Sequence, residues 1–178
     1  MKKIYIILTQ SGTLFSKTIR FFTGKPYNHA SIGLNESLDE FYSFGRKVPT
    51  NPFIAGFVTE HKDTGVFEIF KKSPSVVIEL PVTNEQYESI SNMINNFKIN
   101  KDDYKYDLIN VAFFYSRYRL KRINRFFCSQ FVAYVLNSAG ISTPKPPEQI
   151  QAVDFLKLKK ANVIYKGHIQ NYNKKTIQ

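Results

Sequence analysis

Residues 125–136 have the sequence RFFCSQFVAYVL and contain the only cysteine of the chain. The apolar residues that follow the cysteine recur with helical spacing, at Phe131, Val132, Val135 and Leu136. Gly140 follows this pattern and is a typical helix terminator. The sequence therefore predicts a helix that begins at or near Cys128.

A cysteine at the start of a helix has a distinctive chemical environment. Unpaired backbone N–H groups and the positive end of the helix dipole stabilise a thiolate there. The preceding segment, residues 117–125, is basic, and no Asp or Glu occurs between Leu108 and Pro147. These features predict a thiol with a lowered pKa that acts as a nucleophile at neutral pH. The alternative is that Cys128 is a small buried apolar residue on a core helix, a frequent role for free cysteines.

Length and composition favour one domain with a sizeable core, over residues 1–166, followed by a polar tail over 167–178. A single cysteine excludes an internal disulfide and fits a reducing compartment. The apolar run near the N-terminus ends before Thr9, which is too short for the core of a signal peptide, about 7–15 residues. No apolar run approaches the roughly 18 residues of a membrane span. We therefore expect a cytoplasmic protein.

The net charge of +11 predicts a negatively charged partner or a role in solubility. Anionic lipid, anionic polymer and nucleic acid are the candidates, and the absence of a known nucleic-acid-binding motif disfavours the last. Aromatic residues interleave with the basic segment, which also suits a membrane surface. We predict no metal and no cofactor, because the three histidines are dispersed and no glycine-rich phosphate loop occurs.

The remaining pattern predicts strands first, with helices before and after them. The expected strands are residues 3–8, 26–34, 40–46, 53–58, 65–70, 76–80 and 162–165. The expected helices are residues 14–22, a helix capped by Thr83 and Gln86, one from Asp107 to about Tyr115, the cysteine helix, and a short one at 149–158. This order is typical of an α+β fold in which helices pack against an antiparallel sheet.

A nucleophilic cysteine needs a base, and His29 is the best candidate. It opens an apolar strand and is followed by the small residues Ala30 and Ser31. The other histidines, His61 and His168, lie among polar residues and are expected to be solvated. The alternative for His29 is a hydrogen-bonded histidine at a strand end.

Two segments, YNHASIGL at 27–34 and FCSQFV at 127–132, resemble the circularly permuted papain-like amidohydrolases of the NlpC superfamily. The acyltransferases related to lecithin–retinol acyltransferase belong to the same permuted branch, in which the histidine precedes the cysteine. The resemblance spans roughly residues 1–160. It implies a permuted papain-like fold and a hydrolase or acyl transferase that works through an acyl-thioester. Cys128 would be the nucleophile, His29 the base, and the Cys128 backbone N–H an oxyanion donor.

The same resemblance implies a third, polar residue on the strand after the histidine strand, which offers Glu40, Tyr42 and Ser43. A hairpin centred near Ser37 places Ser43 on the face of His29, and a shift of one residue places Glu40 and Tyr42 there instead. We favour Glu40, because a carboxylate fixes the imidazole tautomer and stabilises its cation. The alternative is that Glu40 is a solvated charge of the hairpin.

The further candidates for substrate or oxyanion contacts are Gln10, Tyr27, Tyr42, Ser43 and Gln130. The expected substrate is an amide in a peptide or a peptidoglycan fragment, and negative charge on it would suit the basic segment. A lipid ester or amide is the second interpretation. The third is a non-catalytic basic module that binds anionic lipid, polymer or nucleic acid.

Overall fold

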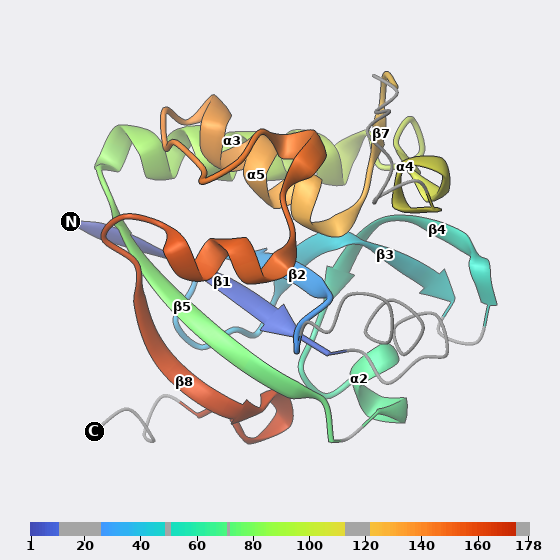
Figure 1. Ribbon diagram of the computed structural model, residues 1–178, viewed down its shortest axis with the longest axis horizontal. Helices are drawn as coiled ribbons and strands as arrows, with labels where there is room; N and C mark the ends of the chain where they lie inside the picture. Colours follow the sequence, from blue (N-terminus) through green and yellow to red (C-terminus); the bar gives the residue numbers. More distant parts are fainter. Residues whose placement is uncertain (11–25, 49–50, 71, 113–121, 174–178) are drawn as a thin grey trace.

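The computed structural model describes residues 1–10, 26–48, 51–70, 72–112 and 122–173. Within them, eight strands form one mostly antiparallel sheet in the order β7-β6-β4-β3-β2-β1-β5-β8. The strands are β1 (Lys2–Thr9), β2 (His29–Gly33), β3 (Phe41–Val48), β4 (Asn51–Glu60), β5 (Pro74–Val82), β6 (Lys105–Tyr106), β7 (Arg125–Phe126) and β8 (Asn162–His168). Helices α3 (Asn84–Ile99) and α5 (Cys128–Ser138) lie together over one face of this sheet (Figure 1). The predicted α+β class is confirmed.

The middle of the sheet is apolar on both faces. Alternate residues of β1 point to opposite faces, and every residue from Ile4 to Leu8 is buried. Ile4, Ile6 and Leu8 join the core under the helices. Tyr5 and Ile7 join a smaller core on the other face. A continuous apolar run therefore forms a central strand with a core on each side.

Helix α3 has the predicted N-terminal cap. The Gln86 backbone N–H donates to Thr83 Oγ1 at 3.2 Å, and the Thr83 N–H donates to Gln86 Oε1 at 3.0 Å. The helix buries Ile90, Ile94 and Phe97 against the core. These contacts confirm the capping box and the helix after it.

Helix α5 begins at Cys128, as predicted. Its apolar residues are buried, including Phe131, Val132, Val135 and Leu136. The rings of Phe131 and Phe97 pack edge-to-face with centroids 5.1 Å apart, which joins α5 to α3. Packing on one face thus fixes where the start of α5 lies over the sheet.

Three predicted elements differ in the structure. Residues 65–70 form helix α2 (Val66–Ile69) and not a strand, because Gly65 adopts a φ of 64° and Phe67 turns into the second core. The expected helix at 149–158 is instead two 3-10 helices, η1 (Pro147–Gln149) and η2 (Ala152–Lys157). The expected tail at 167–178 is ordered as far as 173: β8 runs to His168 and η3 (Ile169–Asn171) follows.

The described part of the expected tail contributes two residues, Ile169 and Tyr172, to the smaller core. The short helix α4 (Leu108–Ala112) begins where we expected, with the Asn110 N–H donating to Asp107 Oδ1 at 3.1 Å. The structure does not describe the predicted helix at 14–22, nor residues 113–115 of the helix predicted from Asp107 to Tyr115. In the part of the chain that the structure describes, no helix has the length and apolar character needed to cross a bilayer.

The cap of α3 gives a test of the fold. Thr83→Ala removes the hydroxyl that accepts from Gln86 and is expected to lower the free energy of unfolding by about 1 kcal/mol. Thr83→Ser keeps the acceptor and serves as the control. Urea unfolding followed by circular dichroism measures both variants, and equal losses in the two would contradict the assigned cap.

Candidate active site

Cys128 is the first residue of α5 and is 7% exposed. Its side chain faces the start of β2, where Sγ lies 3.8 Å from the backbone oxygen of Asn28. The backbone N–H groups of Ala30 and Ser129 hydrogen bond to the sulfur and lower the pKa of the thiol. The thiol therefore sits between a helix N-terminus and a strand start, as the sequence predicted.

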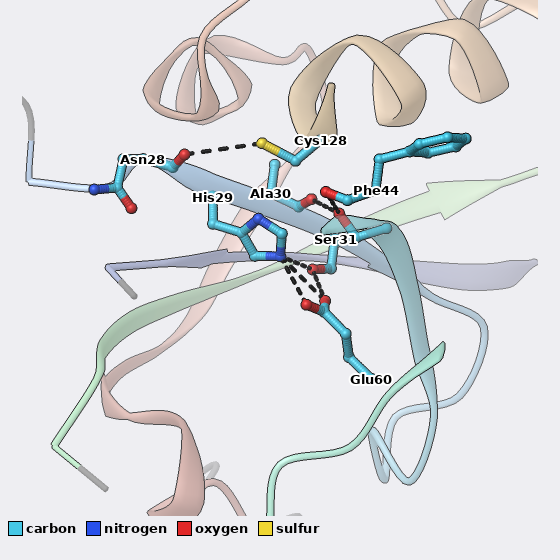
Figure 2. A network of polar contacts seen from close by, with 8 residues as sticks. Asn28, His29, Ala30, Ser31, Phe44, Glu60 and Cys128 are labelled. Carbon is cyan, nitrogen blue, oxygen red and sulfur yellow. Dashed lines mark hydrogen bonds and ion pairs between the residues drawn. The ribbon is translucent and has the colours of Figure 1, made fainter. Parts of the chain in front are cut away.

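His29 is the first residue of β2 and lies beside Cys128. Thr9 of β1 pairs with it across the sheet, which fixes its backbone. Figure 2 shows one ring nitrogen, Nδ1, on the side of the imidazole that faces Cys128, while Nε2 points the other way. Hydrogen bonding between the Cys128 and His29 side chains raises the pKa of His29 and lowers the pKa of Cys128. The structure thus brings together the two residues that the sequence paired.

The outer nitrogen of His29 contacts a carboxylate. Nε2 lies 2.9 Å from Glu60 Oε1 and 3.2 Å from Oε2. The buried Ser31 hydroxyl donates to Glu60 Oε2 at 2.5 Å (Figure 2). Because Nε2–H donates to Glu60, Nδ1 is left to interact with the thiol. Glu60 and Ser31 therefore fix the tautomer and the orientation of the imidazole.

Burial and nearby charges have opposite effects on the pKa values of His29 and Cys128. Burial opposes the imidazolium, but the Glu60 carboxylate and the hydrogen bonds to Cys128 and Glu60 hold the pKa of His29 well above its ordinary value. Burial likewise opposes the thiolate, but the hydrogen bond and charge of His29 hold the pKa of Cys128 below its ordinary value. The raised pKa of His29 and the lowered pKa of Cys128 both favour a thiolate–imidazolium pair near neutral pH.

The prediction that the Glu40 carboxylate contacts His29 is wrong. Glu40 precedes β3, where its carboxylate accepts from the Tyr42 hydroxyl at 2.8 Å and from Lys98 Nζ at 3.3 Å. The carboxylate that contacts His29 comes from Glu60, one strand further away. The alternative that Glu40 is a charge of the hairpin region agrees with these contacts.

The other two candidates on β3 have different surroundings. Pairing of Ile32 with Tyr42 sets the register in which Ser43 shares the face of His29. Ser43 is buried, and its hydroxyl donates to the backbone oxygen of Ala30 at 2.7 Å, so it supports β2 and not the imidazole. Tyr42 points to the opposite face, stacks on Phe57 and donates to Glu40.

The remaining candidates make their contacts with groups other than the imidazole. Gln10 follows Thr9 and is half-buried, and its backbone N–H donates to Pro74 O at 2.9 Å. Tyr27 is half-buried and packs against the main core. Gln130 Oε1 accepts from the Phe127 N–H at 3.4 Å, which caps the start of α5. Gln130 thus supports the helix turn that carries Cys128.

Tyr106 is a further residue of the site that the sequence analysis did not identify. Burial and the nearby charge of Cys128 raise the pKa of Tyr106 well above its ordinary value. Its strand β6 pairs with β7, where Tyr106 lies opposite Phe126, two residues before Cys128. Its hydroxyl therefore stays protonated at neutral pH and can act as a hydrogen-bond donor.

The position of Tyr106 is fixed by the residue that follows it. Asp107 is fully buried and accepts from Asn110 Nδ2 at 2.7 Å and from Arg122 Nη1 at 3.0 Å. Its backbone N–H donates to Phe126 O at 3.0 Å. This network ties β6 to the segment that leads into Cys128 and so holds Tyr106 beside Phe126.

Comparison with models of known protein families finds no match, and comparison with curated proteins finds no significant relative.

Substitution of the two acidic candidates tests which carboxylate serves His29. Glu60→Gln removes the charge that supports the imidazolium, so the pKa of His29 should fall and that of Cys128 should rise. A change of one pKa unit would slow alkylation of Cys128 by iodoacetamide at pH 6.5 roughly tenfold. Glu40→Gln is the matched control and should leave the rate unchanged. A slower rate in the control but not in Glu60→Gln would overturn the assignment.

Proposed function

We propose that this protein is a cysteine hydrolase that cleaves an amide bond through an acyl-thioester, with Cys128 as nucleophile and His29 as general base and acid. The observation that carries the proposal is the arrangement of three side chains: His29 lies between Cys128 and Glu60, its Nδ1 side faces Cys128, and its Nε2 lies 2.9 Å from Glu60 Oε1 (Figure 2). A buried thiol beside a histidine that is itself oriented by a carboxylate is the arrangement of cysteine hydrolases.

In the first half of the reaction, the Cys128 thiolate attacks the carbonyl carbon and forms a C–S bond. The C–N bond then breaks, and the imidazolium of His29 gives its proton to the leaving amine. In the second half, His29 takes a proton from water, the resulting hydroxide attacks the thioester, and the C–S bond breaks. The thiolate leaves, and the imidazolium is restored, so the protons balance over the cycle.

The tetrahedral intermediates carry negative charge on oxygen, which needs donors. The Cys128 backbone N–H is available for this role, because it lies at the first position of α5 and has no partner within the helix. The protonated hydroxyl of Tyr106 is the second donor we propose. A buried site strengthens both interactions.

We further propose that the domain has a permuted papain-like fold. Its support is the order of the parts: the strand with His29 precedes the helix with Cys128, and that helix packs on the sheet that carries the histidine. The same chemistry serves an ester as well as an amide, so lipid esters belong among the substrates to test.

Trapping of the acyl-enzyme tests the proposal. Wild-type protein incubated with a panel of activated amides and esters should gain the mass of one acyl group on Cys128, and hydroxylamine should remove it. Cys128→Ala should show no acylation and a turnover lower by roughly 10⁴-fold or more. Circular dichroism checks that this variant is folded. Turnover that persists in Cys128→Ala would rule out the nucleophile.

The pH dependence of turnover gives a second test. Activity should fall at low pH when the thiolate gains a proton, and at high pH when the imidazolium loses one. Because the pKa of Cys128 is lowered and that of His29 is raised, the plateau should include pH 7. Glu60→Gln should move the alkaline limb to lower pH. A rate that only rises up to pH 9 in the wild type would contradict the ion pair.

A further inference from the structure

We propose that the chain has a second binding site, for a neutral saccharide, in a surface cavity between α3, α5 and the strands β6 and β7. The site is separate from the thiol, and the inference does not rest on the proposed function. It concerns aromatic and amide side chains that the catalytic steps do not use.

The cavity has a volume of about 470 Å³. One stripe of α3 forms a wall of it, because residues three and four positions apart share a face of a helix. Tyr134 of α5 and Phe126 of β7 line it as well. The described residues that line the cavity are Ser89, Asn92, Met93, Asn96, Phe97, Tyr104, Asn124, Phe126 and Tyr134.

Four aromatic rings give the cavity its apolar surface. Tyr104 packs on Phe97 and Phe126, with ring centroids 4.3 Å and 6.2 Å apart. Tyr134 packs on the same two rings, at 6.2 Å and 5.3 Å. Phe97 is buried, whereas Tyr104 is half-buried and Tyr134 is 41% exposed. The cluster therefore holds two tyrosine rings in place and leaves part of each open to a ligand.

Side-chain amides surround these rings. Asn92 and Asn124 are exposed, so their amides are accessible to a ligand. Asn96 is oriented by its neighbours: its Nδ2 donates to the Tyr104 hydroxyl at 3.5 Å, and its Oδ1 accepts from Asn100 Nδ2 at 2.9 Å. An asparagine amide both donates and accepts hydrogen bonds. Each of these groups can therefore bind two neighbouring hydroxyls of a ligand.

The described lining of the cavity contains no charged residue, although charged residues make up 22% of the chain. A charged ligand would lose hydration there without gaining a group of opposite charge. The cavity therefore favours a neutral ligand, whereas the net charge of +11 favours anionic partners for the surface as a whole.

A saccharide combines the properties that this cavity selects. One face of a sugar ring presents C–H groups, which pack on the electron-rich face of an aromatic ring. Its edge carries hydroxyls that donate and accept hydrogen bonds, as the asparagine amides do.

A proline-rich peptide also packs on aromatic side chains. Proline has no N–H, so such a peptide offers acceptors but few donors. It would leave the asparagine oxygens without partners, which costs binding free energy. The amides of the cavity therefore favour the saccharide.

Titration of the full chain, labelled with 15N, tests the site. The probes are neutral trisaccharides of glucose, galactose, mannose and N-acetylglucosamine, with decaproline as the peptide. At least one trisaccharide should shift the side-chain amide signals of Asn92, Asn96 and Asn124 in a saturable manner. We expect a Kd on the order of 1 mM, as for a site that holds about one sugar ring. Raising the salt from about 0.1 to about 1 M should leave the affinity unchanged, because the contacts carry no charge.

Three results of this titration would overturn the proposal. The first is the absence of shifts with every trisaccharide, and the second is binding of decaproline alone. The third is a set of shifts at Cys128 and His29 while the three asparagine amides stay unmoved, which would place the sugar at the thiol.

Exposed residues locate the effect without disturbing the core. Tyr134→Ala removes an aromatic face and Asn92→Ala removes an amide, and each should weaken binding roughly tenfold. Tyr134→Phe keeps the ring and should retain most of the affinity. Asn95→Ala is the matched control, since Asn95 is an exposed asparagine of α3 that is not part of the lining. Equal losses in Asn92→Ala and Asn95→Ala would contradict the site, and circular dichroism checks that each variant is folded.

This binding measurement and the tests of the thiol have separate outcomes. If the wild type binds a trisaccharide at the three asparagines but forms no acyl-enzyme, the saccharide site stands and the proposed hydrolase fails. If it forms an acyl-enzyme but binds no trisaccharide, only the saccharide site is overturned. Cys128→Ala should bind the trisaccharide as the wild type does, because Cys128 is not part of the lining.

Discussion

The interaction between Glu60 and His29 is the constraint on which the rest of the site depends. Both side chains are mostly buried, and a buried charge is costly unless it is paired and hydrogen-bonded. The carboxylate meets this condition with two partners, the His29 ring and the Ser31 hydroxyl. Its charge in turn makes the imidazolium tolerable in a buried position, and the imidazolium favours the thiolate. One acidic side chain thus sets the charge state of two others.

The sheet supplies the geometry that this interaction needs. His29 and Ser31 are alternate residues of β2 and so share a face, and β3 lies between them and Glu60 on β4. Gly45 occupies that gap: a Cβ atom there would stand 3.7 Å from both His29 Cε1 and Glu60 Oε1. A larger side chain would come between the two groups. The absence of a side chain on the middle strand therefore lets residues of two non-adjacent strands meet.

Acidic residues have specific structural roles in this strongly basic chain. Glu60 orients His29, while Asp107 is buried with Arg122 and Asn110 and fixes the strand that carries Tyr106. Asp102 and Glu40 form ion pairs with Lys47 and Lys98 at the surface.

Local pattern in the sequence was sufficient for several features. Helical spacing after Cys128 and the Thr83 capping box predicted α5 and α3, because each depends on residues within a few positions of one another. The strand at His29 followed from its alternation, but its register with β3 stayed open between two alternatives that differ by one residue. The pairing of Cys128 with His29 came from chemistry, since a nucleophilic thiol needs a base and only one histidine had suitable neighbours.

Only the tertiary structure decided which carboxylate reaches the histidine. Glu40 is nearer in sequence, but Glu60 meets His29 because β4 folds back on β3 with Phe41 opposite Glu60. That register depends on the long hairpin between the two strands, which no local pattern specifies. Tyr106 likewise reaches its position through the pairing of a two-residue strand. Ile169 and Tyr172 are core residues, although they lie in a polar stretch of the sequence. Sequence fixes contacts between near neighbours, whereas contacts across strands require the closed sheet.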